Sequence, residues 1–155
     1  MLLKRVVSVL VSVFALGSFG LMAAPAASAA GYGCSGNQIN TYPVKTSSGT
    51  LYGNIYVYYD SSTGRNCAVT VKNSTGGYGS TSWTSVTLAV CKTSTAGSPC
   101  YTDGQPTVTD GGYYKQYAGP VSVSAAGKCI KLFGQISADT PIATGQSPSY
   151  GVHCG

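Results

Sequence analysis

The chain has 155 residues, of which only 8% are charged, and its formal net charge at pH 7 is +5. This length fits one domain with a single hydrophobic core. The basic residues are scattered along the chain, which excludes the clustered basic surface of nucleic-acid-binding proteins, so we expect no nucleic-acid partner.

The segment 1–30 has the three-part layout of a secretory signal peptide. It begins with Lys4 and Arg5, continues as an apolar run, and ends in Ala27-Ser28-Ala29, an A-x-A cleavage site. A membrane anchor is the alternative, because the apolar run approaches spanning length. We predict cleavage, which leaves 31–155 as a single all-β domain with no integral membrane span.

All six cysteines lie beyond the predicted leader. An even number in an exported chain indicates three disulfides. Metal binding, the alternative, usually needs a close C-x-x-C pair, and the chain has none, so we expect no metal and no cofactor. Cys91 and Cys100 bracket a short polar loop and form the first expected pair. Spacing leaves several connectivities open for the other four cysteines; our hypothesis joins chain neighbours, Cys34–Cys67 and Cys129–Cys154.

Strand signals then follow one another along the chain, which contains no Glu. The runs 54–60 and 66–72 flank SSTG and predict a hairpin with Gly64 at a positive φ. The run 85–91 alternates as a strand. Later segments are PTVTD, a DGG turn at 110–112, YYKQYAGPVSVSA, KCIKLFGQI, a looser stretch, and YGVHCG.

Pro120 interrupts the run after the DGG turn and indicates an edge strand or a bulge. In total the signals predict six or seven short strands, with turns every eight to twelve residues. They indicate an all-β fold: a small antiparallel β-sandwich or barrel of meander type, stapled by disulfides.

The strand LYGNIYVYYD, residues 51–60, raises the question of a binding surface. Side chains alternate between the faces of a strand, so Tyr52, Tyr56 and Tyr58 share one face and the aliphatic residues share the other. The partner run 67–71 offers more aliphatic side chains, so we expect the tyrosine row to point away from the core or into a second, more polar layer.

Two interpretations of the tyrosine row stay open. The rings are either ordinary cross-strand packing with wet hydroxyl groups, or an adhesive face that contacts glycan or another protein. The second makes Tyr52, Tyr56 and Tyr58 the candidate binding site. The sequence does not place the later YYKQY segment relative to this row.

Residues with catalytic potential are scarce. Most Asp residues lie in turn contexts, where Asp bonds its own backbone, so paired-carboxylate catalysis gains little support. His153 is the one histidine, and the GQSPS segment around Ser147 lacks the second glycine of a nucleophile elbow. Cys154 is expected in a disulfide. We therefore predict no catalytic residue and no enzyme.

Several segments resemble a known family: NCAVTVK (66–72), YYKQYAGPVSV followed by AAGKCIKLFG (113–134), and the terminal HCG. In this order they are similar to the spore-associated protein A family, small exported proteins of filamentous actinobacteria. The resemblance implies export and association with spores or the surface of aerial filaments, with no established enzymatic activity. All cysteines except Cys91 and Cys100 match the family's positions, and this pair looks like an addition within a longer loop.

We interpret the chain as a secreted, extracellular protein of the spore or cell surface that acts by binding or coating. The expected partner is a cell- or spore-surface component or a secreted protein. One alternative is an adaptor subunit of an exported multi-protein assembly that uses an exposed strand edge. An alternative of another class is a small secreted hydrolase or enzyme inhibitor with an unrecognised site.

Overall fold

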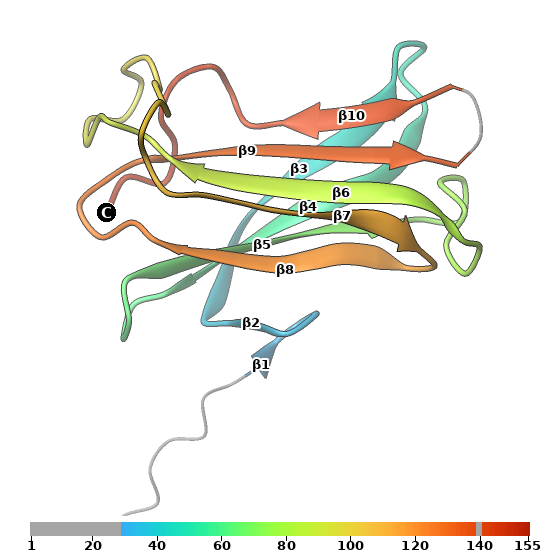
Figure 1. Ribbon diagram of the computed structural model, residues 1–155, viewed down its shortest axis with the longest axis horizontal. Helices are drawn as coiled ribbons and strands as arrows, with labels where there is room; N and C mark the ends of the chain where they lie inside the picture. Colours follow the sequence, from blue (N-terminus) through green and yellow to red (C-terminus); the bar gives the residue numbers. More distant parts are fainter. Residues whose placement is uncertain (1–28, 139–140) are drawn as a thin grey trace, which may run out of the picture.

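One curled antiparallel sheet forms the body of the protein (Figure 1). The computed structural model describes residues 29–138 and 141–155, so all but the last two residues of the predicted signal peptide lie outside the described part. The strands are β1 (Ala29–Ala30), β2 (Cys34–Ser35), β3 (Asn37–Thr46), β4 (Leu51–Asp60), β5 (Arg65–Lys72), β6 (Ser82–Val90), β7 (Thr107–Tyr114), β8 (Tyr117–Ser124), β9 (Ile130–Ser137) and β10 (Ala143–Gln146).

Strands β3 to β10 form a sheet in the order β7-β6-β9-β10-β3-β4-β5-β8, and β1 pairs with β2 separately. The edge strands β7 and β8 lie side by side, which makes the sheet a nearly closed barrel (Figure 1). The predicted all-β antiparallel class is confirmed. The eight strands of this sheet exceed the predicted six or seven, because β3 and β10 form in segments that the sequence analysis did not assign to strands.

The meander order and one turn were predicted wrongly. Strand β5 pairs with β8 and β6 with β9, so several sheet neighbours are distant in the chain. The predicted DGG turn at 110–112 lies inside β7, and the chain reverses at Lys115–Gln116 instead. Neighbouring side chains leave little room for a Cβ at these glycines: one at Gly111 would lie 3.2 Å from Cβ of Ser85 and 3.3 Å from Cζ2 of Trp83, and one at Gly112 would lie 3.0 Å from Cζ of Tyr114.

Other local signals are confirmed. Strands β4 and β5 form the predicted hairpin, and Gly64 has a φ of 65°. Pro120 lies in the edge strand β8, whose register with β5 shifts between Ala68 and Thr70. The terminal YGVHCG segment does not become a strand; it makes isolated bridges, such as Ile130 with Val152.

The barrel interior is the main hydrophobic core, with large aliphatic side chains from β3, β4, β6 and β9. In β4 the aliphatic residues Ile55 and Val57 point inward, opposite Thr70 and Ala68 of β5. Because directly opposed residues share a face, Val69 of β5 points outward. The valines of β5 therefore do not extend the aliphatic face of β4. The sequence had made them candidates for that face, because they lie in the predicted partner strand.

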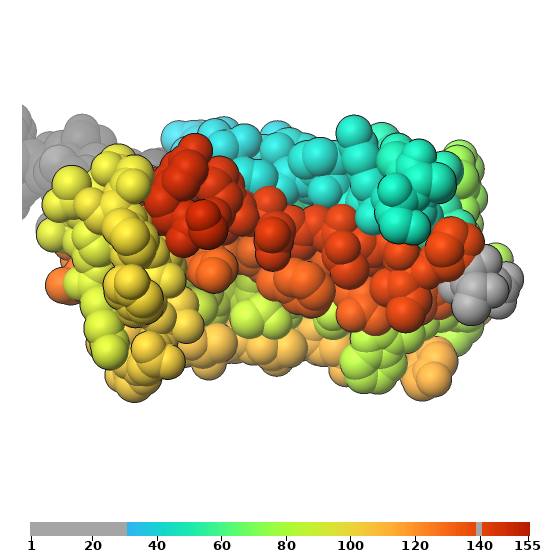
Figure 2. Space-filling model, turned by 90° about the horizontal axis from the view of Figure 1, so that it is seen from above, coloured from blue at the N-terminus to red at the C-terminus, as the bar shows by residue number. Residues whose placement is uncertain are grey.

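Three disulfides staple the barrel: Cys34–Cys67, Cys91–Cys100 and Cys129–Cys154, the pairs of the hypothesis. The first ties the β2 segment to β5. The other two lie together at one end of the barrel, where the C-terminal segment packs on the 91–106 loop (Figure 2). They hold in place two segments that have little regular secondary structure of their own.

The seam between β7 and β8 is bridged by a side chain. Asp110 of β7 accepts a hydrogen bond from the backbone N of Gly119 in β8 at 2.6 Å, and Oη of Tyr114 donates to its other oxygen at 2.7 Å. Charge-assisted bonds of this kind are the stronger ones in proteins. The Asp110 carboxylate therefore links the two edges of the sheet.

Asp110→Asn should lower the free energy of unfolding by about 1–2 kcal/mol, since the amide keeps one acceptor but loses the charge that strengthens both bonds. Urea denaturation measures this effect. The matched control is Asp103→Asn, because Asp103 is exposed and makes only a 3.9 Å ion pair with Lys92, so its loss should be within about 0.5 kcal/mol. Equal midpoints for the two variants would contradict the role of Asp110.

Candidate functional site

The outer face of β4, β5 and β8 carries a second apolar layer. Val69 and Val71 of β5 pack there with Tyr58 and with the Cys34–Cys67 disulfide, which anchors the segment around β2 across this face. Tyr58 is only 4% exposed. Strand β5 is thus buried on both faces, and part of the tyrosine row belongs to this second layer.

Three tyrosine rings meet above this layer. Tyr32, from the segment between β1 and β2, stacks on Tyr56 of β4 with ring centroids 5.9 Å apart. The rings of Tyr32 and Tyr117 of β8 also pack in a T-shaped arrangement, with centroids 5.2 Å apart. Tyr32 is exposed, and the other two rings are half-buried. We call these three residues the tyrosine patch.

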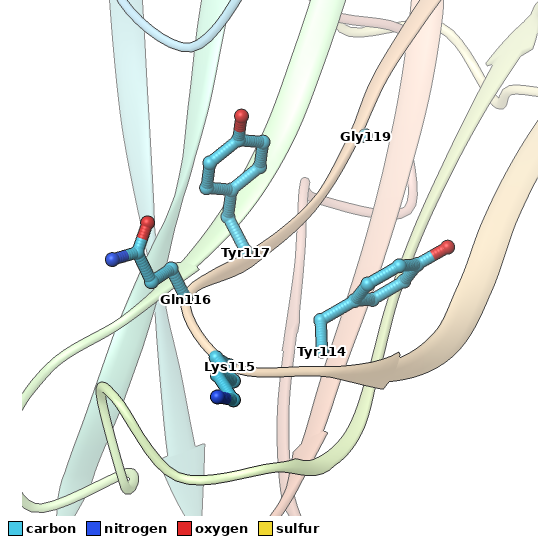
Figure 3. A pocket seen from close by; sticks show the side chains of 5 residues that line it. All are labelled: Tyr114, Lys115, Gln116, Tyr117 and Gly119. Carbon is cyan, nitrogen blue, oxygen red and sulfur yellow. The ribbon is translucent and has the colours of Figure 1, made fainter.

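An open groove adjoins the tyrosine patch at the turn from β7 to β8. Its volume is about 450 Å³, and it is lined by Tyr114, Lys115, Gln116, Tyr117 and Gly119. Figure 3 shows Gln116 beside Tyr117 on one side of the turn, with Lys115 projecting away from them and the Tyr114 ring on the far side. Tyr117 belongs to both, so the patch and the groove are neighbours on the surface.

A buried lysine beneath the groove holds its backbone in place. Lys72 is 3% exposed, and its Nζ donates to the carbonyl oxygens of Ser80 and Tyr114 at 2.6 and 2.8 Å and to Oγ of Ser82 at 2.8 Å. Its backbone N also donates to the carbonyl oxygen of Gln116 at 3.0 Å. Burial lowers the pKa of the Lys72 amino group. The groove is therefore shaped before any ligand arrives.

The patch and groove offer stacking and hydrogen bonding. Burial, together with the neighbouring tyrosines, raises the pKa of Tyr32, so its hydroxyl group is neutral at physiological pH and can donate and accept. The exposed Gln116 adds an amide, and the exposed Lys115 adds one positive charge. This chemistry suits a ligand with flat apolar faces and several hydroxyl groups.

The three candidate tyrosines of the sequence analysis are separated by the fold. Tyr56 belongs to the tyrosine patch, Tyr58 lies buried beneath it, and Tyr52 packs at the margin of the main core. Tyr32 was missed, because it lies outside any strand pattern. The one sequence signal for a special role of Tyr32 is its place between two glycines. In the structure Tyr32 lies in a turn and has a φ of 64°.

Residues weighed for catalysis have structural partners. Ser147 is buried, and its Oγ accepts from the backbone N of Leu132 at 3.0 Å. Cys154 is in a disulfide. Nε2 of His153 lies 3.0 Å from Oη of Tyr42. Within 29–138 and 141–155, no group of three or more His, Cys, Asp or Glu side chains is placed to hold a metal ion.

Comparison with known proteins gives one clear similarity. The chain is 31% identical to Spore-associated protein A of Streptomyces coelicolor over 163 aligned positions, which cover 99% of this chain and 90% of that protein. No model of a protein family matches the chain, and no solved structure matches it. Among the described residues, no helix is long and apolar enough to cross a membrane.

Tyr58→Ser should lower the free energy of unfolding by about 3 kcal/mol or more, because it empties a buried aromatic site. Tyr56→Ser, at a half-buried ring on the same strand face, should cost about 1 kcal/mol or less. Thermal and urea denaturation of both variants measures the difference. Equal losses would show that Tyr58 does not belong to a packed layer.

His153 should make stability depend on pH. Burial lowers its pKa below the ordinary value of 6.5, so the unfolded chain takes up the proton first as the pH falls. Stability is therefore complete above pH 6.5 and declines below it, with a slope of at most about 1.4 kcal/mol per pH unit. Urea midpoints between pH 7.5 and 5 should show this decline, and His153→Gln should flatten it. An unchanged slope in that variant would refute the assignment.

Proposed function

Because the chain belongs to the spore-associated protein A family, we propose that it is an exported, non-catalytic binding protein retained on the spore or cell surface. The predicted secretory leader and the three disulfides support an extracellular location. The tyrosine patch carries the proposal of binding, since it presents three rings at the surface of a rigid barrel.

The proposed ligand is a glycan of the wall or spore surface. Tyrosine combines a flat apolar ring with a hydroxyl group, and it is enriched at interfaces for this reason. Gln116 can bond sugar hydroxyl groups, and Lys115 favours a polymer with some negative charge. The stapled barrel loses little conformational freedom on binding, because Lys72 and Asp110 already hold the groove.

The adaptor alternative has less support from the geometry. Pairing with a partner's strand requires an open sheet edge with free backbone groups. Here β7 and β8 face each other, Gly119 already donates to Asp110, and Pro120 has no N–H to offer. A secreted protein that contacts the tyrosine patch through side chains is the remaining form of a protein partner.

Two residues weighed for the enzyme alternative make structural contacts. The Oγ of Ser147 is engaged with the backbone of β9, and the sulfur of Cys154 is oxidised in a disulfide. Neither is available as a nucleophile in this state.

The double variant Tyr32→Ser/Tyr117→Ser should bind washed spores or purified cell walls at least about tenfold more weakly, because aromatic anchors dominate interface energetics. A sedimentation assay with labelled protein measures retention. Tyr101→Ser is the matched control, since Tyr101 is exposed in the loop before β7 and outside the patch. It should bind like the parent.

Thermal melts of the same proteins separate lost contacts from lost folding. Should the double variant melt far below the parent, the single variant Tyr32→Ser, at the exposed ring, replaces it in the comparison. Parent-like retention of a folded patch variant would overturn the proposal. Loss of retention on whole spores, with unchanged binding to purified wall polysaccharide, would identify a protein partner instead.

A further inference from the structure

A separate cavity lies at the barrel end closed by the C-terminal segment. Its volume is about 200 Å³, and it is lined by Ile39, Tyr59, Asn66, His153, Cys154 and Gly155. These residues come from β3, β4, β5 and the chain after β10. The walls are mostly apolar, formed by an aliphatic side chain, an aromatic ring and the sulfur of a disulfide.

Asn66 gives this cavity an unsatisfied polar group. The residue is 2% exposed, and its Oδ1 has no hydrogen-bond partner in the described part of the protein. Buried amides in folded proteins are nearly always bonded, because the loss of water must be compensated. Asn66 lies opposite Tyr59 and Val123 in the sheet, where an apolar residue would pack without this deficit. Asn66 also lines the cavity, so its amide group is the polar contact that the wall offers to a bound molecule.

His153 is held at the mouth of the same cavity. Its Nε2 lies 3.0 Å from Oη of Tyr42 and 3.4 Å from Nδ2 of Asn40. Because an amide nitrogen can only donate, these partners assign Nε2 as the acceptor and place the proton on Nδ1. The Cys129–Cys154 disulfide fixes the residue next to His153, and the backbone N of Gly127 donates to a backbone oxygen of Gly155. The cavity wall is thus fixed by the fold.

We propose that this cavity binds one small, uncharged, mainly apolar molecule through a single hydroxyl or amide head, which bonds to the amide of Asn66. The mostly apolar walls favour an uncharged ligand, because the lining includes no Lys, Arg, Asp or Glu side chain. A cavity of about 200 Å³ fits one small molecule and is too small to hold a polymer. This site is separate from the tyrosine patch and would hold a different class of ligand.

Phenol and toluene are suitable probes, since they differ by one hydroxyl group. Titration of the ¹⁵N-labelled protein with phenol should shift the amide signals of Asn66, His153 and Cys154 in a saturable way, and toluene should bind more weakly. Asn66→Leu keeps a side chain of similar size and removes the amide, so it should reduce the preference for phenol over toluene about tenfold.

A blocking variant tests the location without touching the core. Ile39 is 40% exposed, so Ile39→Trp should fill the cavity mouth, keep the fold and abolish the saturable shifts. Val108→Trp, at a residue 39% exposed on β7 and outside the cavity, should leave them unchanged. Absence of saturable shifts in the parent, persistence of them in Ile39→Trp, or an unchanged phenol preference in Asn66→Leu would each overturn the proposal.

Discussion

The carboxylate of Asp110 bridges the two edges at which the barrel closes. Strands β7 and β8 are joined by a short turn yet are the two edges of the sheet, and they pair with β6 and β5 instead of with each other. Asp110 bridges them through the backbone of Gly119. From the barrel end, Lys72 bonds the carbonyl oxygen of Tyr114, so the last residue of β7 is held beside the start of β8. Closure thereby places Tyr117 where Tyr32 can meet it.

Strand β5 is buried on both faces, so the packing that stabilises the fold also supports the candidate binding surface. Its inward side chains, Ala68, Thr70 and Lys72, are small or polar, whereas its outward valines support the tyrosines. The β2 segment covers those valines and is tied down by the Cys34–Cys67 disulfide. The rings of the tyrosine patch are thus fixed by a covalent bond and by packing beneath them, which limits the entropy lost on binding.

The two ends of the barrel are closed in different ways. At the end with the β7–β8 turn, the buried amino group of Lys72 gathers backbone oxygens. At the other end, two disulfides and isolated bridges hold the 91–106 loop and the C-terminal segment, and this closure is less complete because a cavity persists beside Asn66. At the first end the polar contacts shape a groove outside the barrel, and at the second end the disulfides leave a small, open cavity.

Alternation and turn chemistry in the sequence already determine the all-β class, the hairpin at Gly64 and the shared face of Ile55 and Val57, because these depend on neighbours in the chain. Only the tertiary structure decides which face of β5 turns inward, because both faces are buried and the more apolar face, with its valines, packs outward beneath the β2 segment. The candidate surface depends on that choice. Tyr32 meets Tyr117 across a long stretch of chain through barrel closure, a contact that no local pattern encodes.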